Sequence, residues 1–275
     1  MASAALLQDR FGSATLAPYT VAPPFVAAIL ARRTQRRYAD RPVPQPLVDL
    51  LCLAALSASS KSDYQQASIL QVNDAGKRAA LAAPFPAMPW IGYAPVFLVF
   101  LGDTRRMQRL GELRGHPAPN TGLEGFFNAT VDAALALQTC ILSAESAGLG
   151  TCPISVLRNQ APLVGEVLGL PDGVFPVAGL CLGWPSEAGH ASLRLPPAVT
   201  VHHDRYDDAA MPDAVVAYDR EREARNPTPP SKQRAPERFG TAAQYGWSED
   251  KARQSAQGEG AAFPPWLRAQ GFTFD

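Results

Sequence analysis

Two continuous apolar runs constrain the fold of this chain more than any other feature. Residues 95–101 (PVFLVFL) and 174–184 (VFPVAGLCLGW) contain no charged side chain and show no alternation of polar and apolar positions. A strand can be apolar on both faces only when both faces of its sheet are covered. An apolar helical pattern over residues 128–147 lies between the runs, and Gly148 and Gly150 end it. These patterns predict an α+β sandwich with helices on both sides of a central sheet.

Size and cysteine usage predict an intracellular protein that needs neither disulfides nor a metal. The chain has 275 residues, of which 47% are hydrophobic, so it can bury a large core. Its four cysteines lie far apart without a CxxC pair, as expected for reduced side chains inside a cytoplasmic protein: Cys52, Cys140, Cys152 and Cys181. The histidines lack the spacing of a metal site, and adjacent histidines on an extended segment point to opposite faces.

Charge and hydropathy exclude two classes of partner. The 25 Lys and Arg residues balance 25 Asp and Glu residues, so no overall basic field would attract a nucleic acid. No run approaches the roughly 20 uninterrupted apolar residues of a membrane span. The mildly apolar residues 1–7 are interrupted by Gln8, Asp9 and Arg10 before a secretory signal could form. We therefore expect no nucleic acid, no membrane and a cytoplasmic location.

A basic cluster, Arg32-Arg33-Thr34-Gln35-Arg36-Arg37-Tyr38, follows a helical pattern over residues 25–33. On composition alone it could be solvated surface, a nucleic-acid patch or a site for a small anion. The neutral charge balance argues against the polyanion and leaves the other two readings open. Guanidinium groups suit a phosphate because their planar fork donates two parallel hydrogen bonds and keeps its charge.

Two further segments are expected to lie near a site. Residues 57–66, dense in short polar side chains, connect a helix that begins at Pro46 to a strand over residues 68–72, which makes them a candidate ligand wall. Residues 111–125 show no periodicity and are predicted to form a loop.

The C-terminal region differs in composition from the rest of the chain. A charged stretch and a proline-rich stretch, with scattered aromatic residues, predict an extended arm without a core of its own. We expect one domain over residues 1–218 and an extension over residues 219–275 that packs on the core or on a partner subunit.

Several motifs, taken in order and spacing, resemble the FMN-dependent nitroreductase family, most closely its major oxygen-insensitive, NADPH-linked branch. The resemblance runs from Arg32 to Tyr206. Its marks are the basic cluster with Pro42, the serine-rich segment ending at Gln65, and residues 144–150 (AESAGLG), 157–159 (LRN) and 179–185 (GLCLGWP). It implies a three-layer α-β-α sandwich with a central mixed sheet, and a homodimer with FMN at the subunit interface. It also implies ping-pong transfer of a hydride from NADPH or NADH, through the flavin, to a small electron-poor acceptor such as a nitroaromatic or a quinone.

The resemblance also implies roles for individual residues. Arg32, Arg33 and Thr34 match positions that hold the FMN phosphate and ribityl chain, and Arg194 matches a second phosphate arginine. Arg36 matches a cation beside the flavin pyrimidine edge, where negative charge develops on reduction. The remaining matches are Ser60 and Gln65 in the polar wall of the pocket, and Ile154 and Ser155 in the loop that approaches flavin N5. Arg36 and Ser155 are the candidate catalytic residues.

The sequence departs from the family pattern at several of these positions. Ser155-Val156 stands where the branch has a glycine pair, Ser192 where it commonly has a lysine, and Met88 where it often has a glutamine. The arginines that the branch uses for NADPH are replaced near Gln244 and Tyr245. Two alternatives therefore stay open: a flavin-binding or flavin-sensing protein of the same fold with little turnover, and a related flavoenzyme reaction on a specific metabolite.

Overall fold

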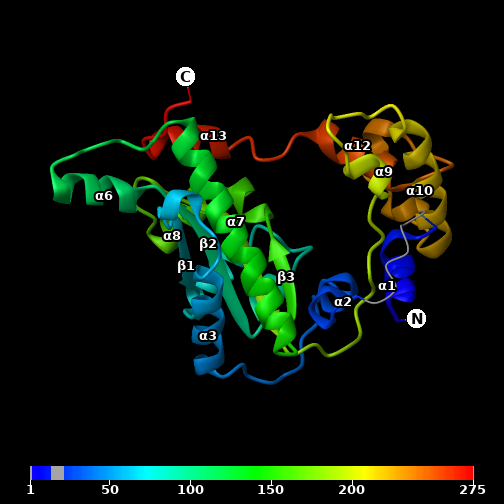
Figure 1. Cartoon of the computed structure of the whole chain (residues 1–275), viewed down its shortest axis with the longest axis horizontal. Coiled ribbons are helices and arrows are strands. Elements are labelled where there is room, and N and C mark those ends of the chain that lie inside the picture. The colour runs from blue at the N-terminus through cyan, green and yellow to red at the C-terminus, as the bar shows by residue number, and fades with distance from the viewer. Residues whose placement is uncertain (1, 14–21, 275) are drawn as a thin grey trace. The chain divides into compact units, whose positions relative to one another are not determined.

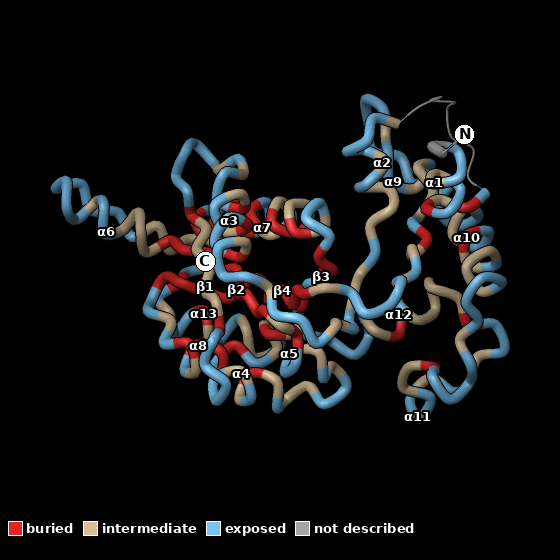
Figure 2. The backbone as a smooth tube through the Cα atoms, turned by 90° about the horizontal axis from the view of Figure 1, so that it is seen from below, coloured by how far each residue is buried: buried red, intermediate tan, exposed pale blue. Residues whose placement is uncertain are grey.

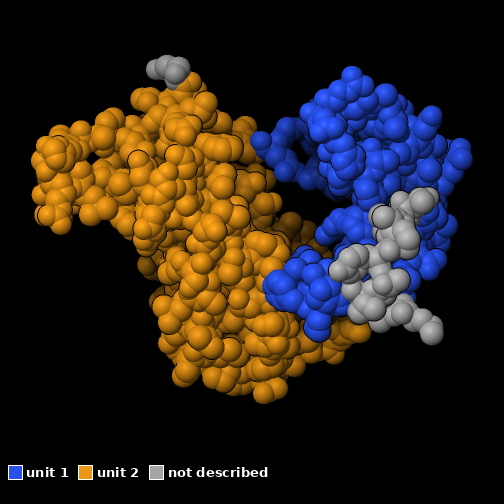
Figure 3. All heavy atoms as spheres, viewed as in Figure 1, with its two compact units in different colours: residues 1–32, 190–259 blue, residues 33–189, 260–275 orange. Residues whose placement is uncertain are grey.

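The computed structural model describes residues 2–13 and 22–274; Met1, residues 14–21 and Asp275 lie outside the described part. The chain forms two compact units, coloured separately in Figure 3. The sheet unit contains residues 33–189 and 260–275, and the helical unit contains residues 1–32 and 190–259. The domain boundary expected after residue 218 lies inside helix α10 (Met211–Arg225).

The sheet unit is built on four strands in the order β1-β2-β4-β3. They are β1 (Ala67–Gln71), β2 (Val96–Asp103), β3 (Gly150–Ile154) and β4 (Val174–Gly183). All three neighbouring pairs are antiparallel, so the prediction of a mixed sheet is wrong. The physical reason is that β4 inserts between β2 and β3, which run in the same direction. In the described part of the chain, parallel pairing is confined to one isolated bridge between Thr34 and Thr151.

Helices cover both faces of this sheet, which confirms the three-layer α+β sandwich (Figure 2). One face packs against α3 (Gln45–Leu56) and α7 (Leu123–Ser146). The other face packs against α4 (Ala75–Ala82), α5 (Trp90–Tyr93) and α8 (Ala161–Leu168). Every residue of β2 and β4 is buried, as the two apolar runs predicted.

Helix α7 begins earlier than the sequence pattern indicated, at Leu123. In the described part of the chain it is the one helix long and apolar enough, by length and composition, to cross a membrane. Its contacts with α3 and β2, and its buried residues Ala129, Ala133 and Ala136, are those of a core helix.

Helix α6 (Arg105–Arg114) occupies the beginning of the region expected to be a loop, so only residues 115–122 lack regular structure there. Its sequence, RRMQRLGELR, carries Met107, Leu110 and Leu113 at helical spacing, but only its last turn falls within the region expected to be a loop. It ends at Gly115, whose φ of 71° is the left-handed conformation that glycine adopts readily. The helix projects away from the sheet (Figure 1).

The end of the chain packs on the sheet unit through aromatic side chains. Helix α13 (Phe263–Ala269) lies against α8, and Phe272 is buried against Phe175 with ring centroids 5.3 Å apart. Phe126 of α7 completes this cluster at 4.8 Å from Phe175.

The helical unit contains α1 (Ala2–Phe11), α2 (Pro24–Ala31), α9 (Pro197–Thr200), α10, α11 (Pro236–Phe239) and α12 (Trp247–Gln257). Residues 219–275 were expected to form an extended arm. Most of residues 219–259 instead fold into short helices with buried side chains of their own, including Tyr245 and Arg253.

Candidate functional site

The basic segment lies along the free edge of β3. Thr34 forms a parallel bridge with Thr151, and the Gln35 backbone N–H donates to the Thr151 carbonyl at 2.8 Å. This close approach requires the glycine at position 150, because a Cβ there would lie 2.6 Å from the Gln35 Cβ. The segment is therefore held by backbone pairing, which leaves its side chains available for other contacts.

Tyr38 anchors the other end of the segment. Its hydroxyl lies 2.8 Å from the Gln35 carbonyl oxygen and 3.2 Å from the Cys181 carbonyl oxygen, and it donates to this pair of acceptors. Burial raises the pKa of Tyr38 far above its ordinary value, so the phenol keeps its proton and remains a donor at neutral pH.

The arginines of this segment differ in their partners. Arg37 pairs with Glu187 at 3.1 Å. The Arg36 guanidinium carbon lies 5.4 Å from the centre of the Trp90 ring, and the Arg36 carbonyl accepts a hydrogen bond from the Tyr93 hydroxyl at 2.6 Å. Among the described residues, no carboxylate pairs with Arg33 or Arg36, and both are exposed. Two guanidinium groups in the sheet unit are thus free to neutralise a bound anion.

Ile154 and Ser155 lie at the end of β3, on the same strand that pairs with Thr34. Ile154 is buried, whereas Ser155 is exposed and precedes the 3-10 helix η2 (Val156–Gln160). Val156 and Met88 pack against the core on the α5 and α8 side of the sheet. Two of the departures from the family pattern are therefore accommodated as core packing.

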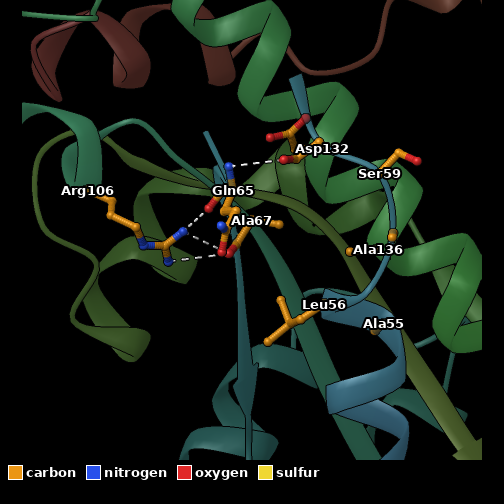
Figure 4. A pocket seen from close by; sticks show the side chains of 10 residues that line it. Ala55, Leu56, Ser59, Gln65, Ala67, Arg106, Asp132 and Ala136 are labelled. Carbon is orange, nitrogen blue, oxygen red and sulfur yellow. Dashed lines mark hydrogen bonds between the residues drawn. The ribbon is translucent and has the colours of Figure 1, made fainter. Parts of the chain in front are cut away.

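Ser60 and Gln65 line a pocket of about 230 Å³ at the start of β1 (Figure 4). Its wall consists of side chains from α3, the serine-rich loop, α6 and α7: Ala55, Leu56, Ala58, Ser59, Ser60, Gln65, Ala67, Arg106, Asp132 and Ala136. The Gln65 backbone N–H donates to the Ser60 hydroxyl oxygen at 3.3 Å, which closes the loop on itself.

The β3-edge group (Thr34, Ile154 and Ser155) and the β1-edge group (Ser60 and Gln65) lie at opposite edges of one sheet. Three strand spacings separate β1 from β3, which is about 14 Å. The register places Ala67 level with Phe175 of β4, and Ile154 level with Gly179 of the same strand. The stretch of β4 from Phe175 to Gly179 adds about 13 Å along the strand direction. Ala67 and Ile154 are therefore about 19 Å apart, and the same geometry gives about 30 Å between Ala67 and Thr34. The sheet unit does not bring its predicted site residues together.

The other two predicted residues, Arg32 and Arg194, belong to the helical unit. Arg10 of α1, which is 5% exposed, connects their segments. Its guanidinium donates hydrogen bonds to the backbone carbonyls of Arg32, Leu30 and Ser192. Its own carbonyl accepts a hydrogen bond from the Arg194 N–H at 2.8 Å. Ser192, which replaces a lysine of the family pattern, thus contributes a backbone acceptor to this cluster.

Comparisons with known proteins decide the family. The nitroreductase family matches residues 29–184, more than half of the chain, and the C-terminal domain of the same family matches residues 192–275. The chain belongs to the nitroreductase family. Family membership accounts for the three-layer sandwich and for the order of the motifs along the chain.

Relatives in this family are similar along most of their length. An FMN reductase [NAD(P)H] of Bacillus subtilis is 34% identical over 197 residues, covering 70% of this chain and 79% of the relative. An oxygen-insensitive NADPH nitroreductase of Salmonella typhimurium is 34% identical over 184 residues, covering 66% and 75%. The structure of the NADPH:FMN oxidoreductase of Vibrio harveyi complexed with NAD+ has a TM-score of 0.78 at 30% identity, covering 90% of this chain and 98% of that chain.

Sequence reasoning missed three residues that hold the segments carrying the predicted site residues. Asp132 and Arg106 hold the serine-rich loop, and Arg10 holds the segments around Arg32 and Arg194. Only Asp132 left a signal: it is an acidic residue on the buried stripe of α7, between Ala129 and Ala136. In residues 2–13 and 22–274, no group of three or more His, Cys, Asp or Glu side chains could hold a metal ion.

Proposed function

We propose that this chain is an FMN-dependent oxidoreductase that takes a hydride from NADPH or NADH and passes it to a small electron-poor acceptor, such as a nitroaromatic or a quinone. The observation that carries the proposal is the pair of exposed guanidinium groups of Arg33 and Arg36, which no carboxylate of residues 2–13 or 22–274 pairs with, on a segment fixed to β3. The names of the relatives, FMN reductase and NADPH nitroreductase, support the same chemistry.

The donor set fits an FMN phosphate. A phosphate needs several charge-assisted donors; within the sheet unit Arg33 offers a guanidinium fork and Thr34 a hydroxyl, and the roles of Arg32 and Arg194 as phosphate ligands stay predictions. When bound, FMN supplies the hydride chemistry, and the protein supplies binding, orientation and electrostatics. Ile154 and Ser155 would present backbone groups to the flavin ring from the end of β3.

We propose that Arg36 acts at the redox end of the flavin. Its guanidinium has no carboxylate partner among the described residues, so its full charge is available where negative charge develops during reduction. We expect Arg36→Ala to slow flavin reduction more than it weakens FMN binding, whereas Arg33→Ala weakens binding by about 1.5–3 kcal/mol. Fluorescence titration gives the affinity and stopped-flow absorbance gives the reduction rate. Equal effects of both substitutions on both quantities would contradict this division.

We propose further that the active form is a homodimer, with the β3-edge group of one subunit facing the β1-edge group of the other. The separation of about 19–30 Å between these groups within one chain supports this arrangement. So does an exposed apolar stripe beside the β1-edge pocket: Leu50 and Leu53 of α3, and Leu123, Phe127, Val131 and Leu135 of α7, are each at least 38% exposed. The α7 residues recur every fourth position and so share one helix face. Apolar patches of this kind mark interaction surfaces.

We also propose a cytoplasmic location, where the four cysteines, free in the structure, would stay reduced.

The decisive experiment is reconstitution of the purified protein with FMN. We expect the protein to bind the flavin, NADPH or NADH to bleach the absorbance of the bound flavin, and a nitroaromatic or quinone to restore it. A protein that takes up no FMN would overturn the proposed function. A bound flavin that stays oxidised for minutes in excess of both nucleotides would indicate a flavin-binding protein without turnover.

A further inference from the structure

We propose that Asp132 is a positioning residue of the flavin site, which fixes the serine-rich loop of the β1-edge group in its binding conformation. This inference rests on the proposed function, because the loop's ligand is the proposed FMN. Asp132 itself would not touch the reacting atoms. It acts through Ser60 and Gln65, which line the same pocket (Figure 4).

The contacts of Asp132 span the second half of the loop, from Lys61 to Gln66. One carboxylate oxygen accepts the Lys61 backbone N–H at 2.9 Å, and the other accepts the Gln66 backbone N–H at 3.0 Å. Asp132 is 2% exposed, and no basic side chain among the described residues pairs with it. Its charge is therefore balanced by backbone donors of the loop, which is a strong form of hydrogen bond in a buried place.

The loop needs such support because its backbone is strained. Ser62, Asp63 and Gln65 have φ values of 50°, 58° and 52°, in the left-handed region that residues other than glycine rarely adopt. Such residues persist only where the surroundings hold them, and they cluster at functional sites. Three of them within four positions would relax to another conformation if the contacts at the two ends were lost.

Arg106 of α6 supports the loop with the opposite charge. Its guanidinium donates to the carbonyl of Gln65 and, at 3.3 Å, to the carbonyl of Ala67. A buried carboxylate thus binds the loop's N–H groups while a guanidinium binds its carbonyls. The two side chains approach from different helices and hold the backbone on both sides of Gln65.

Asp132→Asn tests the inference with almost no change of shape. The amide keeps one acceptor oxygen but presents an NH₂ group to the second backbone N–H, so one loop donor loses its partner. We expect FMN affinity to fall about tenfold or more, as for the loss of one charge-assisted bond. We also expect the turnover number at saturating FMN to stay within about threefold of wild type, because Asp132 does not touch the reacting atoms. Amide hydrogen exchange at Lys61 and Gln66 should become faster in the FMN-free protein.

Asp219→Asn is the matched control. Asp219, in the helical unit, also accepts a backbone N–H, that of Ser248 at 3.0 Å, and ties two segments together. This variant should lose stability without changing exchange at Lys61 and Gln66 or the FMN dissociation constant.

A second pair of variants removes a loop donor while leaving Asp132 in place. Lys61 opens the 3-10 helix η1 (Lys61–Asp63) after an extended Ser60, a position that accepts proline. Lys61→Pro should weaken FMN binding, whereas Lys61→Ala, which keeps the N–H, should not. A wild-type protein that binds no FMN overturns the proposed function and this inference with it. If wild type binds FMN, then unchanged affinity in both Asp132→Asn and Lys61→Pro overturns the inference alone.

Discussion

Mixing two defective subunits tests whether each site takes residues from two chains. One variant, Arg33→Glu/Arg36→Glu, would reverse the charge of the β3-edge group. The other, Ser60→Tyr, would fill the pocket of about 230 Å³ in the β1-edge group. We expect neither homodimer to bind FMN tightly, because each of its sites would contain one defective half.

The expected recovery follows from two-fold symmetry. In a heterodimer of the two variants, one site combines both defective halves and the other combines both native halves. The heterodimer should therefore bind one FMN per dimer, about half of the wild-type content. Within one chain the two groups are separated by about 19 Å or more, which is too far for any side chain to span. The recovered site must therefore take one group from each subunit.

Co-expression with two different affinity tags, followed by purification on both, yields the heterodimer free of either homodimer. Its flavin absorbance per mole of protein and its NAD(P)H-dependent reduction of bound flavin are then measured. The control is a heterodimer of two Ser60→Tyr subunits that carry different tags, which should bind no flavin. If the mixed heterodimer is also empty, each site is built from a single chain and the two-chain reasoning is refuted.

Three further predictions concern single residues. Tyr38→Phe should lower the free energy of unfolding by about 1–3 kcal/mol at pH 7, measured in urea. Burial raises the pKa of Tyr38 in the folded state, so the stability that the phenol contributes is complete below about pH 10 and is lost as the pH rises further. The wild type should lose this stability at high pH, whereas the variant should not. Phe127→Ala removes a side chain that is 61% exposed and should weaken the dimer by about 3 kcal/mol per subunit in sedimentation equilibrium, whereas Val216→Ala in the helical unit, 49% exposed in wild type, should not. Burial raises the pKa of the Cys140 thiol to about 12, so iodoacetamide at pH 8 should label it only after unfolding, as read by mass spectrometry.

Hydropathy patterns predicted the layers of the fold but not the direction of its strands. The two buried runs became β2 and β4, and the helical pattern between them became α7. Periodicity carries no information on which strand lies between which, so the antiparallel sheet was not predicted. Strand β3 was not predicted because it is short and contains Pro153. Helix α6 was not predicted although Met107, Leu110 and Leu113 recur in it at helical spacing.

The sequence predicted candidate site residues where the charged side chains of a motif are themselves the groups that would bind a ligand. The basic cluster gave Arg33 and Arg36, but only the structure separated them from Arg37, which pairs with Glu187. Supporting residues were less visible, since Arg10 and Asp132 act on backbone groups of distant segments. Such contacts depend on which segments the fold brings together, and a single sequence does not record that.

The order of the motifs along the chain conceals how they are divided in space. Thr34, Ser60 and Ser155 read as successive parts of one pocket, yet the strand order puts the second of them across the sheet from the other two. This sheet of four strands is too narrow to curl until its edges meet around one ligand. A second copy, docked through the exposed stripe of α3 and α7, would bring the missing half to each edge, because two-fold symmetry supplies both halves twice. The apolar stripe and the divided site therefore have one common explanation, and the complementation experiment tests it directly.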